Sequence, residues 1–221
     1  MADTTTAWNT YAQQKPQRRA MNAKGETTWF NWTQFPDHGP GAELLDVTSG
    51  DAVLDLGCGT GGNLAHLASL GVRPVGVDLS ETQLAAATDR WAEAGLVLHR
   101  AEATVFLESV PERFAAIYSV FGAAWFTDPA ILLPAAQKAL RPGGTFAFSH
   151  RPPVEGCYGC QASYITRGDE EDPLVVKRWD YEPGTWTGIL ADHGFTEPRA
   201  RVLAAPPGRR KIGTLLVSAT A

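Results

Sequence analysis

The sequence predicts an α/β protein built on an open, mostly parallel sheet, and three observations lead to this prediction. Short apolar runs alternate with amphipathic stretches from residue 52 onward. The apolar run at residues 53–56 breaks into glycines and then resumes, from Leu64, with leucines at helical spacing. A second strand-like run over residues 73–77 ends in Asp78. The first two runs therefore read as a buried strand, a tight loop and a helix, followed by a second strand.

The glycine-rich loop is suited to binding a nucleotide-like ligand. Glycines accept positive φ and let a ligand approach the main chain, and the helix start offers free N–H groups with a partial positive charge. The spacing Gly57-x-Gly59-x-x-Gly62 fits the dinucleotide fingerprint. Asp78 follows the first glycine at about the ~20 residues where such folds carry a ribose-binding carboxylate.

The remaining elements follow from the same pattern. Ser80 is a good N-cap for the helix after the second strand, and Asp128 with Pro129 begins a later one. The glycines of residues 140–144 suit the C-terminal cap of that later helix. The pattern weakens over residues 150–181, which read as an irregular insertion. The other expected elements are a helix from Trp8, a helical turn at 42–46, helices at 81–94 and 183–193, and strands at 96–99, 114–121, 145–149, 195–203 and 212–218.

Composition and charge limit the class of protein. The chain has 221 residues, enough for one domain with a full core, a net charge of -5 and a pI near 5.5. An acidic chain is a poor match for nucleic acid, which favours a basic face. No apolar run approaches the ~20 residues of a membrane span, and the first residues do not resemble a signal peptide. We therefore expect a soluble, cytoplasmic protein with no membrane or nucleic-acid partner.

The three cysteines predict no metal site. Cys58 lies inside the glycine loop and reads as a small space-filling residue. Cys157 and Cys160 form a C-x-x-C pair, but structural zinc takes four protein ligands and no second pair is present. We interpret the pair as reduced thiols in a loop, with a metal or redox role as the alternative.

The residues Asp55-Leu-Gly-Cys-Gly-Thr-Gly61, followed by Gly76-Val-Asp78, resemble the first two motifs of class I S-adenosylmethionine-dependent methyltransferases. The resemblance implies a Rossmann-like, seven-stranded methyltransferase fold, with a mostly parallel sheet and an antiparallel C-terminal edge hairpin. It implies S-adenosyl-L-methionine as the cofactor. It also implies a single domain over 1–221, with an N-terminal lid or cap at 1–50 and a catalytic core at 51–221 that contains the insertion.

The resemblance also assigns cofactor-binding residues. Glu102 stands where the family often has the aspartate of Gly-Asp-Ala, which contacts the adenine amino group, so one extra methylene must be accommodated. A solvent-facing glutamate is the alternative. The expected cofactor-binding residues are Tyr11, Asp55, Gly57, Cys58, Gly59, Gly61, Asn63, Asp78, Leu79, Glu102, Ala103 and Ser119.

The acceptor site is predicted from aromatic residues. Trp29, Phe30, Trp32 and Phe35 crowd one N-terminal segment, and the segment after the fourth strand adds Phe121, Trp125 and Phe126. We expect both groups to enclose a small, flat, aromatic or natural-product-like metabolite, although packing on the sheet or at a dimer interface is an equal alternative. Transfer from a sulfonium needs mainly alignment in a dry site, and a base where the acceptor carries a proton. The candidate bases are His38 and His150, with Tyr158 weaker, and structural roles remain the alternative for each histidine.

Two other functions stay open. An NAD-dependent oxidoreductase would use the same glycine spacing, but it should show a catalytic Tyr-x-x-x-Lys or a substrate domain after the glycine loop, and neither is visible there. A non-catalytic cofactor-binding relative would keep the glycine loop and lack an open acceptor site. The sequence allows a monomer or a homodimer and does not identify the acceptor atom.

Overall fold

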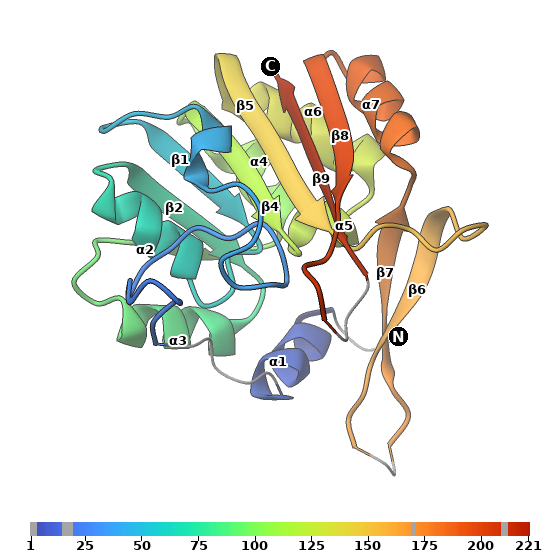
Figure 1. The fold of residues 1–221 in the computed structure, drawn as a ribbon, viewed down its shortest axis with the longest axis horizontal. Coiled ribbons are helices and arrows are strands. Elements are labelled where there is room, and N and C mark those ends of the chain that lie inside the picture. The colour runs from blue at the N-terminus through green and yellow to red at the C-terminus, as the bar shows by residue number, and fades with distance from the viewer. Residues whose placement is uncertain (1–3, 15–19, 169–170, 209–211) are drawn as a thin grey trace.

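The computed structural model describes residues 4–14, 20–168, 171–208 and 212–221, which form a layered α/β fold (Figure 1). No helix in these ranges is both long and apolar enough to cross a membrane. The helices are α1 (Thr4–Gln14), η1 (Ala42–Leu45), α2 (Gly62–Ser69), α3 (Glu81–Arg90), α4 (Ala103–Ser109), α5 (Ala123–Phe126), α6 (Pro129–Ala139) and α7 (Pro183–Asp192). The strands are β1 (Ala52–Leu56), β2 (Arg73–Asp78), β3 (Val97–Arg100), β4 (Phe114–Val120), β5 (Leu140–His150), β6 (Gly159–Ile165), β7 (Leu174–Asp180), β8 (Thr196–Leu203) and β9 (Thr214–Thr220).

The main sheet has seven strands in the order β3-β2-β1-β4-β5-β9-β8. Strands β1 to β5 pair in parallel, whereas β9 pairs antiparallel with both β5 and β8. The β8–β9 pair therefore forms an antiparallel hairpin at one edge. The predicted fold class is confirmed, including this hairpin, which alternating helices and strands alone would not require.

Side chains of alternate residues feed two separate cores, one on each face of the sheet. On one face, Ile117, Phe146 and Phe148 pack with α4, α6 and α7. On the other face, Ala116 and Tyr118 pack with α2, η1 and the N-terminal segment. Both faces are covered, as a mostly parallel sheet requires.

The N-terminal segment is built into the second of these cores. Phe30 and Trp32 pack against Tyr118 at ring centroid distances of 5.2 and 6.0 Å. Trp32 is 0% exposed, its indole Nε1 donates to the Gly41 carbonyl, and its own carbonyl accepts from Ser149 Oγ. Residues 29–45 thus complete one layer of the fold, and their division from the core as a lid stays a prediction.

The insertion between β5 and α7 is more regular than its sequence suggested. We expected an irregular segment at 150–181, but β6 and β7 pair antiparallel over seven residues as a separate two-stranded sheet. Its inner face packs on α1 through Ile165, Leu174 and Val176. Of the residues that weakened the pattern, Pro152, Pro153 and Gly156 lie before β6 and Gly159 begins it, so the alternation in residues 174–180 was the signal that was missed.

The turn at 140–144 also differs from the prediction. Helix α6 ends at Ala139, and Leu140 is already extended, with ψ 148. The register of β5 on β4 then jumps, from Phe114 opposite Leu140 to Ala116 opposite Thr145. The glycines therefore form an irregularity inside β5 and do not cap the helix, because the strand has more residues here than its partner.

Trp32 provides a test of this role. We expect Trp32→Ala to lower the free energy of unfolding by about 3–5 kcal/mol, because a fully buried indole leaves a cavity. Urea unfolding measures the loss. The control is Tyr164→Ala on β6, where the side chain is 65% exposed and the change should stay within about 0.5 kcal/mol. A loss below about 1 kcal/mol for Trp32→Ala would contradict the structural role of the segment.

Candidate active site

The glycine loop lies where the strand order reverses, between β1 and β4. Ligands in open α/β sheets bind at such a switch point, beyond the carboxyl ends of the strands. Here Gly57, at φ 84, approaches the segment after β4 so closely that a Cβ on it would lie 2.7 Å from Ala123 N. A Cβ on Gly122 would lie 2.5 Å from the Leu56 carbonyl oxygen. The two loops therefore meet through backbone alone.

Asp78 holds the tip of the glycine loop. Its Oδ2 accepts a 2.8 Å hydrogen bond from Gly59 N, and its Oδ1 accepts a 2.8 Å bond from Ser80 N. Burial raises the pKa of the Asp78 carboxyl, and its bonds to backbone N–H groups oppose that rise. Each oxygen keeps a second lone pair, so the carboxylate can still accept hydrogen bonds from a ligand.

Gly59 itself leaves space for a ligand. Its φ is 53, and among the described residues a Cβ built there would find only Gln83 Nε2, at 4.0 Å. The loop is thus closely packed at Gly57 and open at Gly59. That arrangement presents main chain to an incoming molecule while the base of the loop stays rigid.

Asp55 is a buried acid in β1, just before the glycine loop. Its side chain is 4% exposed, and Oδ1 has no hydrogen-bond partner among the described residues. Burial raises the pKa of Asp55 to about 8, a hydrogen bond from Tyr118 lowers it, and the charge of Asp78 raises it further. A cationic group of a ligand would lower this raised pKa, because it would favour the ionised carboxylate.

Several other predicted cofactor-binding side chains already form hydrogen bonds within the protein. Asn63 exchanges two hydrogen bonds with the Asn31 backbone, and Ser119 Oγ donates to the Leu56 carbonyl and accepts from Ala124 N. Glu102 caps α4, where Oε2 accepts from Thr104 and Val105 N–H groups. These side chains build the walls of the site. Cys58 and Ala103 are buried, Gly61 is the N-cap residue of α2, and Leu79 links Asp78 to Ser80.

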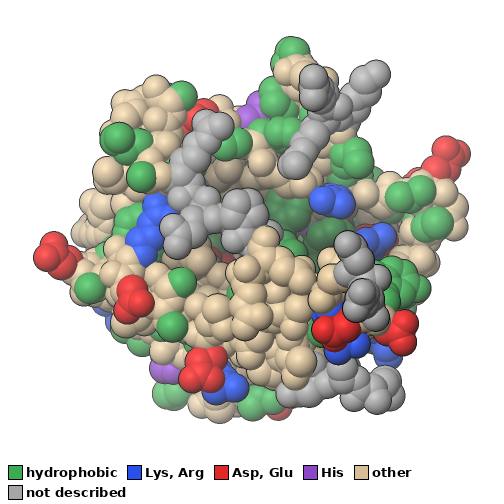
Figure 2. All heavy atoms as spheres, turned by 90° about the horizontal axis from the view of Figure 1, so that it is seen from below, with side chains coloured by type: hydrophobic (Ala, Val, Ile, Leu, Met, Phe, Trp, Pro, Cys, Tyr) green, Lys and Arg blue, Asp and Glu red, His purple; other side chains and the backbone are tan. Residues whose placement is uncertain are grey.

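Helix α1 covers this region. Asn9 Oδ1 accepts from Ser80 Oγ at 2.8 Å, and Gln14 Nε2 donates to the Thr166 carbonyl at 2.6 Å. The helix thus lies between α3 and the β6–β7 hairpin, below the carboxyl ends of the strands (Figure 1), and it carries the predicted cofactor residue Tyr11. Figure 2 views this face from below and shows a hollow with hydrophobic side chains in its depth.

The two aromatic groups predicted to enclose an acceptor lie on opposite faces of the sheet. Trp29 and Trp32 are buried with the N-terminal segment, and Phe35 packs edge-on to His38 at 5.9 Å. Trp125 instead stacks on His150, on the other face, with centroids 5.1 Å apart and an interplanar angle of 5°. Phe121, in the left-handed region at φ 51, lies 6.1 Å from Trp125. Only Phe121, Trp125 and Phe126 remain together beside the glycine loop.

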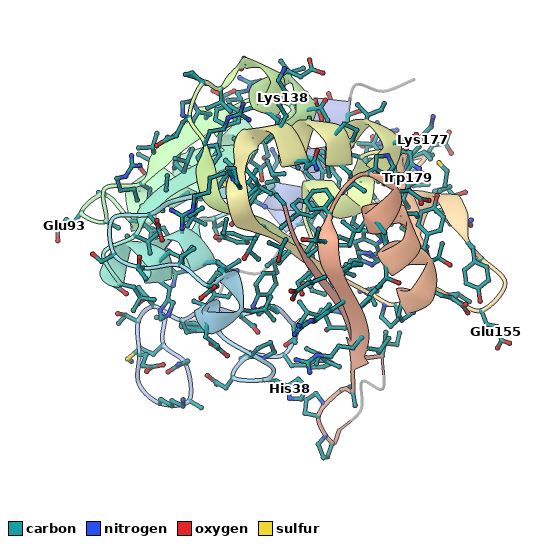
Figure 3. The ribbon with its side chains drawn as sticks, turned by 90° about the horizontal axis from the view of Figure 1, so that it is seen from above. His38, Glu93, Lys138, Glu155, Lys177 and Trp179 are labelled. Carbon is teal, nitrogen blue, oxygen red and sulfur yellow. The ribbon has the colours of Figure 1, made fainter. Side chains whose placement is uncertain are left out.

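The three candidate bases, His38, Tyr158 and His150, likewise do not lie together. His38 Nε2 bonds to the Ala204 carbonyl at 2.7 Å, which makes that nitrogen the donor, and Figure 3 shows His38 far from the β7 residues Lys177 and Trp179. Tyr158 is exposed, and its hydroxyl donates to Glu182, which raises the pKa of the phenol.

His150 is 0% exposed, and its Nδ1 donates to the Arg151 carbonyl at 2.6 Å. Burial lowers the pKa of His150 to about 4, so it is neutral at pH 7 and its Nε2 has no partner among the described residues.

Sequence reasoning missed two charged residues of the site. Asp180 accepts from Trp125 Nε1 and from Arg178 Nε, both at 2.8 Å. Both charged residues, Arg178 and Asp180, lie in the insertion that was read as irregular. Reading residues 174–180 as a strand would have placed Arg178 and Asp180 on the same face as Leu174 and Val176.

The match to a family model covers the part of the chain that contains the glycine loop and Asp78. Residues 53–144 match the family model described as "Methyltransferase domain". Over 103 residues the chain is 32% identical to a ubiquinone biosynthesis O-methyltransferase of Methylococcus capsulatus and 31% identical to that of Pseudomonas putida. Each match covers 46% of this chain and 44% of the relative, so the chain spans less than half the length of the curated relatives it matches.

Solved structures show the same fold. An S-adenosylmethionine dependent methyltransferase from Mesorhizobium loti matches with a TM-score of 0.59 at 24% identity, over 81% of this chain and 94% of that one. The 1,6-didemethyltoxoflavin-N1-methyltransferase of Burkholderia thailandensis, solved with its substrate and S-adenosylhomocysteine, matches with a TM-score of 0.58 at 21% identity, over 78% and 71%. The protein therefore has the fold of these methyltransferases, and residues 53–144 match the methyltransferase-domain model.

The buried, neutral His150 predicts a pH dependence of stability. Its pKa is lower in the folded protein than in the unfolded chain, so as the pH falls the unfolded chain takes up the proton first. The stabilising contribution is therefore complete above about pH 6.5 and is lost as the pH falls towards 4. Between pH 7 and pH 5 the wild type should lose about 2 kcal/mol more than His150→Asn. Urea unfolding at both pH values checks this, and equal losses would show that His150 titrates normally.

Proposed function

We propose that this protein is an S-adenosylmethionine-dependent methyltransferase acting on a small aromatic metabolite of the natural-product type. The observation that carries the proposal is the glycine loop at the switch point, tied by Gly59 N to the Asp78 carboxylate and open beside Gly59. The methyltransferase-domain match over residues 53–144 supports it. So do the relatives, which are named as O-methyltransferases and N-methyltransferases.

The residues present fit this cofactor. Asp78 offers free lone pairs for ribose hydroxyls, Gly59 leaves room for close approach, and the unpartnered Asp55 Oδ1 suits a cationic group. When bound, S-adenosylmethionine supplies a methyl group already activated by its sulfonium. Tyr11 on α1 would cover the site, and Glu102, Ser119 and Asn63 would act chiefly by holding its walls.

The acceptor would lie against Phe121, Trp125 and Phe126, beside the glycine loop. Of the candidate bases, His150 is supported best, because it is neutral, its Nδ1–H is held by the Arg151 carbonyl and its Nε2 lone pair has no described partner. His38 lies on the other face and uses Nε2 as a donor. The cytoplasmic location and the monomeric or homodimeric state remain predictions from the sequence.

Gly59 tests the proposed function against the oxidoreductase alternative. Calorimetry should show that the wild type binds S-adenosylhomocysteine and does not bind NADH. Gly59→Val should abolish that binding, because the branched side chain would fill the open space beside the loop.

The matched control for this experiment is Gly95→Val. Gly95 has φ 65, and no heavy atom of the described part of the chain lies within 4 Å of a Cβ built there, so it carries the same backbone strain away from the site. Unchanged affinity in a folded Gly59→Val protein, or binding of NADH alone, would refute the assignment.

Asp78 tests the ribose contact. Charge-assisted hydrogen bonds are worth about 1.5–3 kcal/mol each, so Asp78→Ala should weaken S-adenosylhomocysteine binding by about tenfold or more. The control is Glu81→Ala, an exposed acid three residues on that pairs with Arg100. A change below about twofold for Asp78→Ala, with a large loss for Glu81→Ala, would move the ribose contact to Glu81.

A further inference from the structure

The inner face of β7 carries a charged pair at the end of an apolar surface. Leu174 and Val176 pack in a cluster with Ala7, and the partly buried Trp8, Tyr11 and Phe126 pack against it. Continuing along the same face, Arg178 and Asp180 come next. The hairpin, α1 and α5 thus share one apolar surface that ends in an ion pair.

Both carboxylate oxygens of Asp180 accept hydrogen bonds from neighbouring side chains. Its side chain is 3% exposed, Oδ1 accepts from Trp125 Nε1 and Oδ2 accepts from Arg178 Nε. A buried carboxylate is stable only when paired and hydrogen-bonded, and these two bonds provide both. Asp180 is therefore a positioning residue that fixes the Trp125 indole and the Arg178 guanidinium.

Arg178 has binding capacity beyond this pair. Its hydrogen bond to Asp180 uses Nε, its Cζ lies 5.5 Å from the Trp125 ring, and its side chain is 25% exposed. The terminal nitrogens form a planar fork that matches a carboxylate in two parallel hydrogen bonds. Because the guanidinium is already held in place, binding costs less conformational entropy than it would for a free arginine.

The position of Arg178 links it to the proposed methyl-transfer site. Trp125 belongs to α5, which begins directly after Gly122, and Gly122 meets Gly57 of the glycine loop through its backbone. Phe121 lies 6.1 Å from Trp125. An aromatic molecule lying against Phe121 and Trp125 would therefore be beside the glycine loop with one edge towards Arg178.

We propose that Arg178 binds a carboxylate on the methyl acceptor, so that the acceptor is a planar aromatic acid. The inference rests on the proposed function and specifies its substrate class. Asp180 already offsets one unit of the charge of Arg178, so a monoanion is favoured over a dianion such as a phosphate monoester. The aromatic ring of the acceptor lies against Phe121, Trp125 and Phe126.

The test compares acids with their neutral amides on protein saturated with S-adenosylhomocysteine. The probes are benzoate, 4-hydroxybenzoate and indole-3-acetate, each paired with its amide, and calorimetry gives the dissociation constants. We expect at least one acid to bind the wild type about tenfold more tightly than its amide. Binding of S-adenosylhomocysteine is measured first, because its absence would refute the proposed function and this inference with it.

Two variants separate recognition from folding. Arg178→Met with Asp180→Asn removes both charges together, so no buried carboxylate is left unpaired, and the asparagine oxygen can still accept from Trp125. We expect this variant to lose the preference for the acid while amide binding changes by less than about twofold. Arg178→Lys keeps the charge without the fork, and its affinity for the acid should fall about fivefold or more.

Lys177→Met is the matched control, since this neighbour lies on the exposed, opposite face of β7 and should leave both affinities unchanged. Near-ultraviolet circular dichroism confirms that each variant is folded. If S-adenosylhomocysteine binds but no acid is preferred over its amide, the inference is wrong and the proposed function stands. The same holds if every folded Arg178 variant keeps the full preference for the acid.

Discussion

The contact between the loop after β1 and the loop after β4 is the constraint on which this structure depends. Gly57 and Gly122 meet backbone to backbone, at distances that no Cβ could share. Because β1 and β4 are neighbours at the switch point, the contact determines where the glycine loop ends and where α5 begins. The position of α5 then determines that of Trp125, and through Trp125 that of Asp180 and Arg178.

Buried acids in this region are held in three different ways, and each way suits a different task. Asp78 is bonded by two backbone N–H groups and keeps lone pairs for a ligand. Asp180 is bonded by Trp125 and Arg178 and has a positioning role. Asp55 has only Tyr118, so burial raises its pKa to about 8 and leaves Oδ1 unpartnered. A group left in this state inside a core is costly, which makes Asp55 a candidate for contact with a ligand.

The aromatic residues on the two faces of the sheet have different roles. On one face, Phe30 and Trp32 replace a covering helix and complete the core. On the other face, Trp125 and Phe126 lie between the glycine loop and the hairpin, and Trp8 of α1 packs on Phe126 with centroids 4.5 Å apart. The N-terminal region therefore does two things: residues 29–45 complete the core, and α1 covers the carboxyl ends of the strands.

The sequence by itself determined the order of the main-sheet elements, the glycine loop and the acid at the end of β2, because these depend on local periodicity and on spacing within about 25 residues. It also indicated the fold class through the resemblance of residues 55–61 and 76–78. Only the tertiary structure decided which face of the sheet each aromatic occupies. A strand that is apolar on both faces does not indicate which segment of the chain packs on either face. The pairing of Arg178 and Asp180 with Trp125 was likewise decided by tertiary structure, since residues some 50 positions apart meet only when the hairpin packs on α5.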